Sequence, residues 1–392
     1  MSTVLRHGPI DDPKDFARFQ AISEQCFRFP SSYWEPYVAN MGRDNFRGMW
    51  RDKEIVGGYG VYRIGQFFGG RRLEMAAIAV VGVPPEERAL GIAAEMMAAS
   101  LRELRALGTP LAALFASTQR VYRKVGYEQA GSRVLYRVAT ADFPRTRERL
   151  PAQPVAAVAS DDFRRIYLEW ARRTNGQLDR SDGLWNRVLR TMEAPIVSYT
   201  IGQPSKPEGY VVFEHYGGIG RPQKIEVRDL VAATPRALAT IFSLLGDHRS
   251  TARTSYFYGS HTDPRFALFA EETWKVSEAE RWMLRIVDVA AAFRGRGYAP
   301  STTAELHLEV RDDILPENSG RWRLRVAGGK GEVTSGGEGR MRIDARGLAP
   351  LFSGYFNATA LADLGWLEAD PDSITAADAI FAGPETWMAD GF

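Results

Sequence analysis

The spacing of apolar positions changes along the chain, and residues 75–115 show this change most clearly. Residues 75–83 form a nearly unbroken apolar run with β-branched members, which predicts a buried strand. Pro84-Pro85 ends the run, because proline has no N–H for a strand ladder. Apolar residues then recur at helical spacing, at Ala93, Met97, Leu101 and Leu104. Residues 111–115 are a second apolar strand, so the order strand, turn, helix, strand predicts a βαβ-like crossover.

The same periodicities predict elements along the rest of the chain. Before the crossover we expect a helix within residues 12–29, an irregular aromatic loop at 28–37, and hairpin-like strands at 46–50 and 54–67. After it we expect a half-buried strand at 132–138, a helix at 161–174 and a strand at 209–215. A strand at 224–231 and a helix at 235–245 then repeat the order strand, turn, helix. The last region alternates as antiparallel strands over one apolar face at 304–310, 321–326 and 341–345, and then turns helical.

Length and composition indicate a globular protein of several domains. The chain has 392 residues, of which 45% are hydrophobic and 25% charged, with a formal net charge of +2. This length accommodates two or three domains. Residues 151–160 (PAQPVAAVAS) are typical of a domain edge, and the pattern changes again near residue 289. We therefore predict domains at 1–150, 151–288 and 289–392.

Composition also argues against several classes of protein. The balanced charge gives no reason to expect a nucleic-acid partner. The single cysteine, Cys26, excludes an intrachain disulfide framework, and the five histidines lack ligand spacing, so we predict no metal. No apolar run has the form of a signal peptide or the length of a membrane span, and we expect a cytoplasmic protein.

The turn inside the crossover is the first candidate site. It reads Arg88-x-x-Gly91-x-Ala93 and opens a helix. A helix N-terminus presents unpaired N–H groups and so binds anions, the small residues permit close approach of a pyrophosphate, and Arg88 adds a charged donor. An ordinary strand-to-helix turn in which Gly91 serves packing has the same spacing, and spacing alone favours this second interpretation, because a short Gly-containing turn is a weak signal.

The flanking residues favour the first interpretation. The pattern Val-x-Pro-x-x-Arg-x-x-Gly-x-Ala at residues 83–93 resembles the acetyl-CoA-binding motif of the GNAT acetyltransferases. The continuation from Phe115 through Tyr122 to Gly126-Tyr127 looks like the next motif in the form seen in the Eis (enhanced intracellular survival) aminoglycoside acetyltransferases. Residues 313–324 (DILPENSGRWRL) resemble the third domain of that family, and the terminal phenylalanine matches its chain end.

The resemblance implies an α+β fold with three domains. Two tandem GNAT-like mixed α/β domains, the second degenerate because its turn at 231–237 lacks Arg-x-x-Gly-x-Ala, would precede a C-terminal sterol-carrier-like α+β domain. It also implies an acetyl-CoA-dependent N-acetyltransferase that assembles as a homo-oligomer, commonly a hexamer. The acceptor would be a primary amine on an aminoglycoside-like molecule, a polyamine or a lysine.

The resemblance assigns roles to particular residues. Tyr122 would be the general acid that protonates the leaving thiolate, and the terminal carboxylate of Phe392 would be the general base. Acetyl-CoA would be bound by Val81, Gly82, Val83, Arg88, Ala89, Leu90, Gly91, Ile92, Ala93, Ala94, Ser117 and Thr118, with the N–H of Val83 facing the thioester oxygen. The family turn is rich in arginine, whereas this one carries Glu86-Glu87, which weakens the expected attraction for phosphate.

Three residues are candidates for the amine site. Tyr33 and Trp34 would present aromatic faces to a cationic amine, because the segment after the first helix borders the acceptor site in GNAT proteins. Asp390 is the acidic residue nearest the chain end. An alternative of another class stays open, in which the chain is a non-catalytic protein that binds CoA, an acyl group or a lipid, and Tyr122 and Phe392 are merely structural. An enzyme restricted to one protein lysine is a third possibility.

Overall fold

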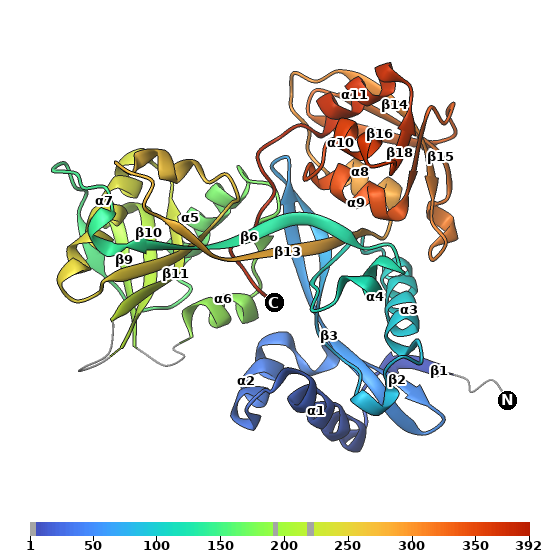
Figure 1. Ribbon diagram of the computed structural model, residues 1–392, viewed down its shortest axis with the longest axis horizontal. Helices are drawn as coiled ribbons and strands as arrows, with labels where there is room; N and C mark the ends of the chain where they lie inside the picture. The colour runs from blue at the N-terminus through green and yellow to red at the C-terminus, as the bar shows by residue number, and fades with distance from the viewer. Residues whose placement is uncertain (1–4, 191–194, 218–222) are drawn as a thin grey trace. The chain divides into compact units, whose positions relative to one another are not determined.

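A computed structural model describes residues 5–190, 195–217 and 223–392 (Figure 1). The chain divides into two compact units. The first unit consists of Met1–Gly131, Arg281–Gly383 and Phe392. The second unit consists of Ser132–Glu280 and Pro384–Gly391. The chain passes from one unit to the other within the strands β6 (Glu128–Ala139) and β13 (Lys275–Ile286), and again after Gly383 and after Gly391.

The first unit begins with a mixed sheet in the order β1-β2-β3-β4-β5-β13. Its strands before β13 are β1 (Leu5–Pro9), β2 (Phe46–Arg51), β3 (Glu54–Phe68), β4 (Arg71–Gly82) and β5 (Leu111–Phe115). The helices are α1 (Pro13–Phe27), α2 (Ser31–Met41), α3 (Ile92–Ala106) and α4 (Gln119–Arg123). This order contains the predicted crossover, since β4, α3 and β5 follow one another and β4 and β5 are parallel.

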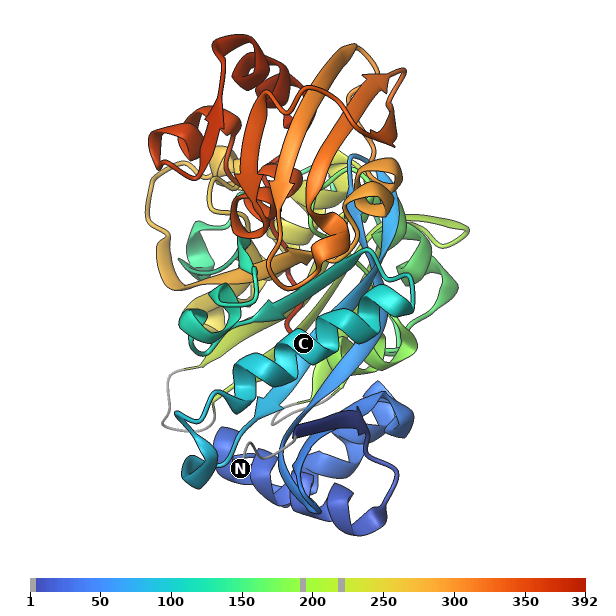
Figure 2. The same cartoon turned by 90° about the vertical axis from the view of Figure 1, so that its right-hand side faces the viewer.

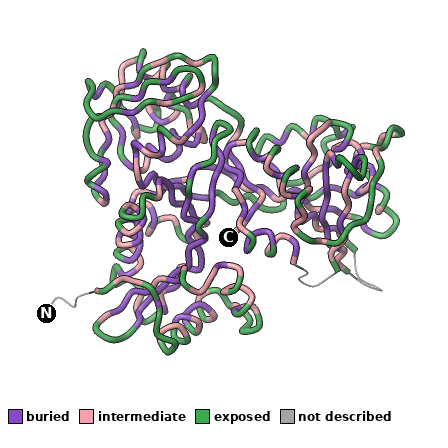
Figure 3. Tube along the Cα trace, turned by 180° about the vertical axis from the view of Figure 1, so that it is seen from behind, coloured by how far each residue is buried: buried purple, intermediate pink, exposed green. Residues whose placement is uncertain are grey.

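Helix α3 crosses one face of this sheet and supplies much of its core (Figure 2). Met96, Met97, Leu101 and Leu104 are buried against strand residues that include Ile78 and Leu114. Tyr122 and Tyr127 belong to the same cluster. The strands are buried along most of their length, as Figure 3 shows, so the sheet is a rigid support for the turns at its ends.

The segment at 28–37 differs from the prediction of an irregular loop. Ser31–Met41 form α2, although Pro36 lies inside it. Trp34 packs against the rings of Phe16, Phe19 and Phe46 at centroid distances of 5.6, 5.9 and 5.8 Å. Burial of this apolar surface outweighs the poor helix propensity of the prolines.

The first unit also contains a separate five-stranded sheet in the order β16-β15-β14-β17-β18. Its strands are β14 (Ala304–Arg311), β15 (Gly320–Ala327), β16 (Lys330–Ser335), β17 (Met341–Asp344) and β18 (Leu367–Ala369). Helices α8 (Val289–Gly295), α9 (Ala345–Ser353), α10 (Ala358–Asp363) and α11 (Pro371–Phe381) accompany it (Figure 1). The apolar face is confirmed by the buried side chains of Leu306, Leu308, Val310, Leu324 and Val326. The prediction of antiparallel pairing was wrong for β17, which runs parallel to β14, because alternation is the same in either strand direction.

The second unit repeats the layout of the first sheet. Strands follow the order β6-β12-β11-β10-β9-β7, with β7 (Ala152–Pro154), β9 (Ile196–Gln203), β10 (Lys206–Tyr216), β11 (Lys224–Ala232) and β12 (Thr254–Gly259). Helices α5 (Asp161–Ala171), α6 (Asp182–Leu189) and α7 (Pro235–Asp247) complete it, together with the two-residue strand β8 (Leu178–Asp179). As with β4 and β5, the strands β11 and β12 that flank α7 are parallel.

Two glycines let the β3–β4 hairpin touch the end of α8. A Cβ added to Gly69, at the hairpin tip, would lie 2.0 Å from the carbonyl oxygen of Gly297. The N–H of Gly297 donates to the carbonyl of Phe68 at 3.0 Å.

We predict that Gly69→Ala lowers the free energy of unfolding by about 1–3 kcal/mol more than the control Gly108→Ala. Gly108 also has a positive φ, 72° against 58° for Gly69, but nothing within 4 Å of its Cβ position. Chemical denaturation measures both variants, and equal losses would mean that the close contact has no energetic weight.

Candidate active site

Strands β4 and β5 separate at the end of the sheet that carries the candidate site. They pair only at Met75–Ala77 with Leu111–Ala113, although β4 runs on to Gly82. Val80 has a φ of 50°, which is a strained conformation for a β-branched residue. The β3–β4 register shifts beside it, between Gly58 and Gly60. Beyond Ala77 the backbone of β4 makes no ladder with β5, so β5 does not pair the backbone groups of residues 81–83.

The turn after β4 presents the uncapped N-terminus of α3. Gly91 is the N-cap residue, has a φ of 80°, and supplies no side-chain hydrogen bond. The first backbone bond of the helix runs from the N–H of Glu95 to the carbonyl of Gly91 at 3.1 Å. The N–H groups of Ile92, Ala93 and Ala94 precede that bond, so they have no acceptor within the helix. Since Ala89, Leu90 and Gly91 are exposed, these donors lie at the protein surface.

The two glutamates of the turn are paired with arginines from neighbouring elements. Glu86 accepts from Arg18 of α1 at 3.1 Å, and Glu87 accepts from both terminal nitrogens of Arg51 at 2.5 and 3.1 Å. Arg88 donates from Nε to the carbonyl of Val83 at 3.1 Å and is exposed. The acidic charge that distinguishes this turn is therefore paired with arginines of neighbouring elements.

Tyr122 lies on α4, a single turn of helix that follows β5. Its side chain is 8% exposed, and its ring meets the ring of Tyr127 edge to face at 6.1 Å. Burial raises the pKa of Tyr122 to about 12. The phenol is therefore protonated throughout the physiological range, as an acid must be before it donates. Ser117 and Thr118, between β5 and α4, are exposed.

The terminal residue lies at the same end of β5. The ring of Phe392 meets the ring of Phe115, the last residue of β5, edge to face at 5.4 Å. Phe392 is half-buried. The first unit therefore contains Phe392 as well as Tyr122, Ser117 and Thr118. Phe392 contacts Phe115, which precedes Ser117 by two positions in the sequence.

Comparison with known proteins assigns the fold to a family. Residues 12–130 and 176–286 each match an acetyltransferase (GNAT) domain, and residues 289–389 match a sterol carrier protein domain. A crystal structure of a GCN5-related N-acetyltransferase from Anabaena variabilis superposes with a TM-score of 0.96 at 35% identity, over 99% of this chain and 100% of that one. The N-acetyltransferase Eis of Mycobacterium tuberculosis is 27% identical over 334 residues, 79% of this chain and 78% of the relative. The chain is a GCN5-related N-acetyltransferase of the Eis type.

A further relative of this N-acetyltransferase is an uncharacterized N-acetyltransferase of Streptomyces avermitilis. It is 27% identical over 384 residues, which are 89% of this chain and 90% of the relative. The matches confirm the predicted fold class of two GNAT domains and a sterol-carrier-like domain, and they confirm that the protein is an acetyltransferase. In the described part of the chain, no helix combines the length and the apolar character that crossing a membrane requires. The same part of the chain contains no group of three or more histidine, cysteine or acidic side chains placed to hold a metal ion.

The second GNAT domain of this N-acetyltransferase closes the turn that the first leaves open. Helix α7 follows β11 as α3 follows β4. Its N-cap, Thr234, accepts from the N–H of Ala237 at 3.2 Å, and Pro235 supplies no N–H at all. Thr234 and Pro235 thus remove free N–H groups of the kind that α3 retains, which agrees with the absence of the Arg-x-x-Gly-x-Ala pattern from this turn.

Asp390 is an anchor of the chain end within the second unit. It is 5% exposed, and both of its oxygens accept from Nε of Arg180 at 3.0 Å. Arg180 also pairs with Asp229, at 2.5 and 3.2 Å, and its guanidinium lies 3.9 Å from the ring centre of Tyr167. The hydroxyl of Tyr167 donates to Asp390 at 3.3 Å. The predicted contact of Asp390 with an amine substrate would require this ion pair to open.

Backbone contacts fix the same tail. The N–H of Met388 donates to the carbonyl of Ser132 at 3.1 Å, and Gln177 donates to the carbonyl of Trp387 at 2.9 Å. Arg133 donates to the carbonyl of Ala389 at 3.0 Å. Sequence reasoning missed Arg180 and Arg133, because nothing local marks a residue that binds a segment more than 200 positions away.

The aromatic candidates on α2 differ in exposure. Tyr33 is half-buried, and its role as a substrate contact stays a prediction. Trp34 is 2% exposed and lies in the aromatic cluster of α1, α2 and β2, so its ring faces are covered by other side chains. The structure therefore gives Trp34 a packing role and leaves Tyr33 as the residue of this pair that a ligand can reach.

We predict that Asp390→Ala frees the chain end of this N-acetyltransferase. The variant loses charge-assisted hydrogen bonds worth about 1.5–3 kcal/mol, while Arg180 keeps Asp229 as a counter-ion. Carboxypeptidase A should then release Phe392 several-fold faster than from the native chain. Asp247→Ala is the control, because its exposed pair with Arg149 contributes only about 0–1 kcal/mol. An unchanged rate of release in Asp390→Ala would show that Asp390 does not hold the tail.

Proposed function

We propose that this protein transfers an acetyl group from acetyl-CoA to a primary amine. The observation that supports this most directly is the uncapped N-terminus of α3 after the separated end of β4, with Tyr122 on the helix after β5 and Phe392 in ring contact with the last residue of β5. Separated parallel strands leave backbone donors free for the ligand arm, and the helix end favours the pyrophosphate.

The residues present fit acetyl-CoA as the cosubstrate. The N–H groups of Ile92, Ala93 and Ala94 would supply donors for a phosphate, since they precede the first backbone bond of α3 and Gly91 gives them no side-chain cap. Because Glu86 pairs with Arg18 and Glu87 pairs with Arg51, Arg88 is the cation of the turn that neither glutamate pairs with. Val81, Gly82 and Val83, together with Ala89 and Leu90, would line the arm of the cosubstrate from β4, and Ser117 and Thr118 from the end of β5.

The reaction balances with one base and one acid. The amine nitrogen attacks the thioester carbonyl, a C–N bond forms, and the C–S bond breaks. One amine proton passes to the carboxylate of Phe392, and the departing thiolate takes the phenolic proton of Tyr122. Proton exchange with solvent resets both groups. Holding the amine and the thioester together supplies several kcal/mol of barrier reduction.

The anchored tail supports the base assignment. A free α-carboxyl group has an ordinary pKa of about 3.5, so it accepts a proton well only when it is desolvated and held in place. The ring contact of Phe392 with Phe115 restricts the terminal residue beside the end of β5, within the unit that contains Tyr122.

The acceptor that we propose is a primary amine on an aminoglycoside-like molecule, a polyamine or a lysine, bordered by Tyr33. The relative named N-acetyltransferase Eis motivates this range of acceptors. We also propose that the protein acts in the cytoplasm as a homo-oligomer, with a hexamer as the first state to test. The predicted domain limits at residues 150 and 288 remain proposals.

We predict that Tyr122→Phe lowers kcat by about 10²–10⁴-fold, the usual contribution of a general acid, with little change in KM for acetyl-CoA. CoA release with a panel of aminoglycosides and polyamines measures it. Tyr127→Phe is a matched control, because it removes a buried hydroxyl that has no hydrogen-bond partner among the described residues. Similar activity in both variants would dismiss Tyr122 as the acid, and a native chain that binds acetyl-CoA but acetylates no amine would favour a binding protein.

We predict that residues added after Phe392 lower kcat by about 10²-fold or more, because they remove the carboxylate from its ring anchor. The same residues added before Met1 should have no such effect. The acid limb of the pH–rate profile, which reports the base, should shift or vanish only in the C-terminally extended chain. Full activity of that chain would require another base.

A further inference from the structure

The helix that carries Tyr122 is too short to hold itself in place. Helix α4 spans only Gln119–Arg123, and one turn of helix is unstable without tertiary contacts. Its end is closed by the N–H groups of Val125 and Tyr127, which donate to the carbonyl of Tyr122 at 3.0 and 3.1 Å. The position of Tyr122 therefore depends on what holds residues 123–128.

Arg285 of β13 holds this segment from the side. It is 1% exposed, and its Nε donates to the carbonyl of Val125 at 2.9 Å. A Cβ added to Gly126 would lie 2.8 Å from that Nε. Gly126, which the motif contains and which has a φ of 86°, is thus the residue that lets Arg285 approach the backbone.

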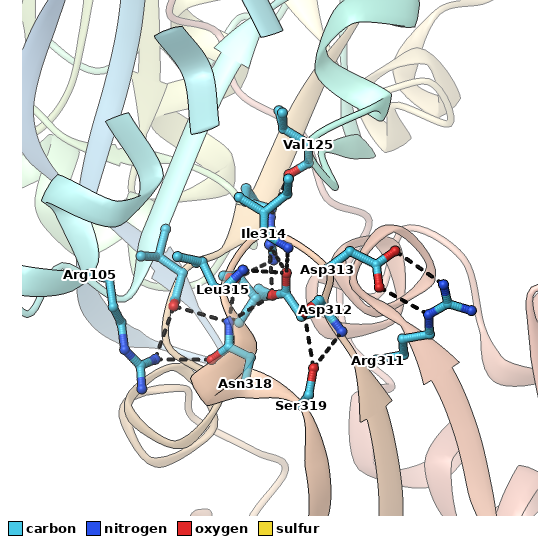
Figure 4. Close-up of polar contacts among 12 residues, drawn as sticks. Arg105, Val125, Arg311, Asp312, Asp313, Ile314, Leu315, Asn318 and Ser319 are labelled. Carbon is cyan, nitrogen blue, oxygen red and sulfur yellow. Dashed lines mark hydrogen bonds and ion pairs between the residues drawn. The ribbon is translucent and has the colours of Figure 1, made fainter. Parts of the chain in front are cut away.

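Asp312 fixes Arg285 from the loop that follows β14 in the sterol-carrier-like domain (Figure 4). The two carboxylate oxygens accept from Arg285 at 2.6 and 2.7 Å. One of them also accepts from the N–H groups of Ile314 and Leu315 at 3.1 and 2.9 Å. Burial opposes ionisation, but the charge and hydrogen bonds of Arg285 outweigh it and hold the pKa of Asp312 below its usual range. The carboxylate is therefore charged and fixed in orientation.

The same loop holds the far end of α3. Asn318 donates to Asp312 at 3.0 Å and accepts from Arg105, in the last turn of α3, at 3.0 Å (Figure 4). Arg105 also pairs with Asp288 at 3.1 Å. The opposite end of α3 is the open N-terminus at the candidate phosphate site, so one loop supports both helices that flank the site.

A second contact from the same domain reaches α4. Glu128 is 1% exposed and accepts from Arg123, the last residue of α4, at 2.8 Å and from Arg346 of α9 at 2.7 Å. The sterol-carrier-like domain therefore contacts residues 123–128 directly through Arg346, and indirectly through Asp312 and Arg285.

We propose that the loop of residues 312–318 is a positioning element for acetyl transfer. Asp312 acts through Arg285 on the helix of Tyr122, and Asn318 acts through Arg105 on α3. The inference rests on the proposed function, in which Tyr122 is the acid. It gives the sterol-carrier-like domain of this chain a role in the acetyltransferase reaction that needs no lipid ligand.

The variant that tests the proposal is Arg285→Met/Asp312→Asn. It leaves no uncompensated buried charge, and the amide introduced in place of the carboxylate retains an oxygen for the N–H groups of Ile314 and Leu315. We expect kcat for amine acetylation to fall about 10–100-fold, because misplacement of a catalytic group by about 1 Å has this effect, while KM for acetyl-CoA stays within about twofold. Arg296→Met is the matched control. Arg296 is also 1% exposed and donates from Nε to a backbone carbonyl, that of Phe352 at 2.9 Å, without contacting α3 or α4 in the described structure.

A double-mutant cycle with Tyr122→Phe separates positioning from general destabilisation. If the pair acts through Tyr122, its substitution has little further effect on kcat once the hydroxyl is gone. Hydrogen exchange supplies a readout that needs no turnover, and residues 119–127 should exchange at least several-fold faster in the paired variant but not in Arg296→Met.

Each outcome decides the proposal. A native kcat in the paired variant, or losses that multiply with that of Tyr122→Phe, overturns it. If the paired variant does not fold, Arg285→Lys replaces it, because it keeps the charge but not the fork geometry. Its loss of kcat should likewise be smaller in the Tyr122→Phe background than in the native background. A native chain without turnover refutes the proposed function instead. Unchanged exchange of residues 119–127 would then still refute the positioning role.

Discussion

The separation of β4 from β5 is the constraint on which the rest of the site depends. Parallel strands joined by a crossover helix normally stay paired to their ends, but here the ladder stops at Ala77 and Ala113. The strained backbone of Val80 bends β4 just beyond that point. The end of β4 leads into the turn that opens α3, and the end of β5 leads into α4, which carries Tyr122. Strain of this kind persists only where surrounding packing holds it, and the buried core of α3 against the sheet does so.

Buried charge organises the two other parts of this N-acetyltransferase. In the second unit, Arg180 between Asp229 and Asp390 fixes the tail that ends in Phe392. In the first unit, Arg285 and Asp312 fix the segment after Tyr122. A buried ion pair adds little net stability, because desolvation of the two charges offsets most of their attraction. What it adds is a single permitted geometry. Arg285 fixes the backbone at Val125, three positions after Tyr122 in the sequence, and Arg180 fixes Asp390, two positions before Phe392.

The duplicated architecture shows how one fold serves two purposes. The first GNAT domain leaves the N-terminus of its crossover helix open, whereas the second caps it with Thr234 and Pro235. The capped domain instead supplies the residues that bind residues 384–391. The sterol-carrier-like domain, in turn, contributes contacts to α3 and α4.

The sequence by itself determined the fold class, the crossover, the open turn and the candidate acid and base, because each depends on local pattern or on a contiguous motif. It predicted a loop where α2 forms and an antiparallel β17, since the burial of Trp34 and the direction of a strand are settled by distant partners. Only the tertiary structure showed that Glu86 and Glu87 are paired, that Asp390 is buried against Arg180, and that Gly126 makes room for Arg285. These facts join residues up to 210 positions apart, and a sequence pattern carries no record of such contacts because their energy depends on burial and geometry rather than on neighbours along the chain.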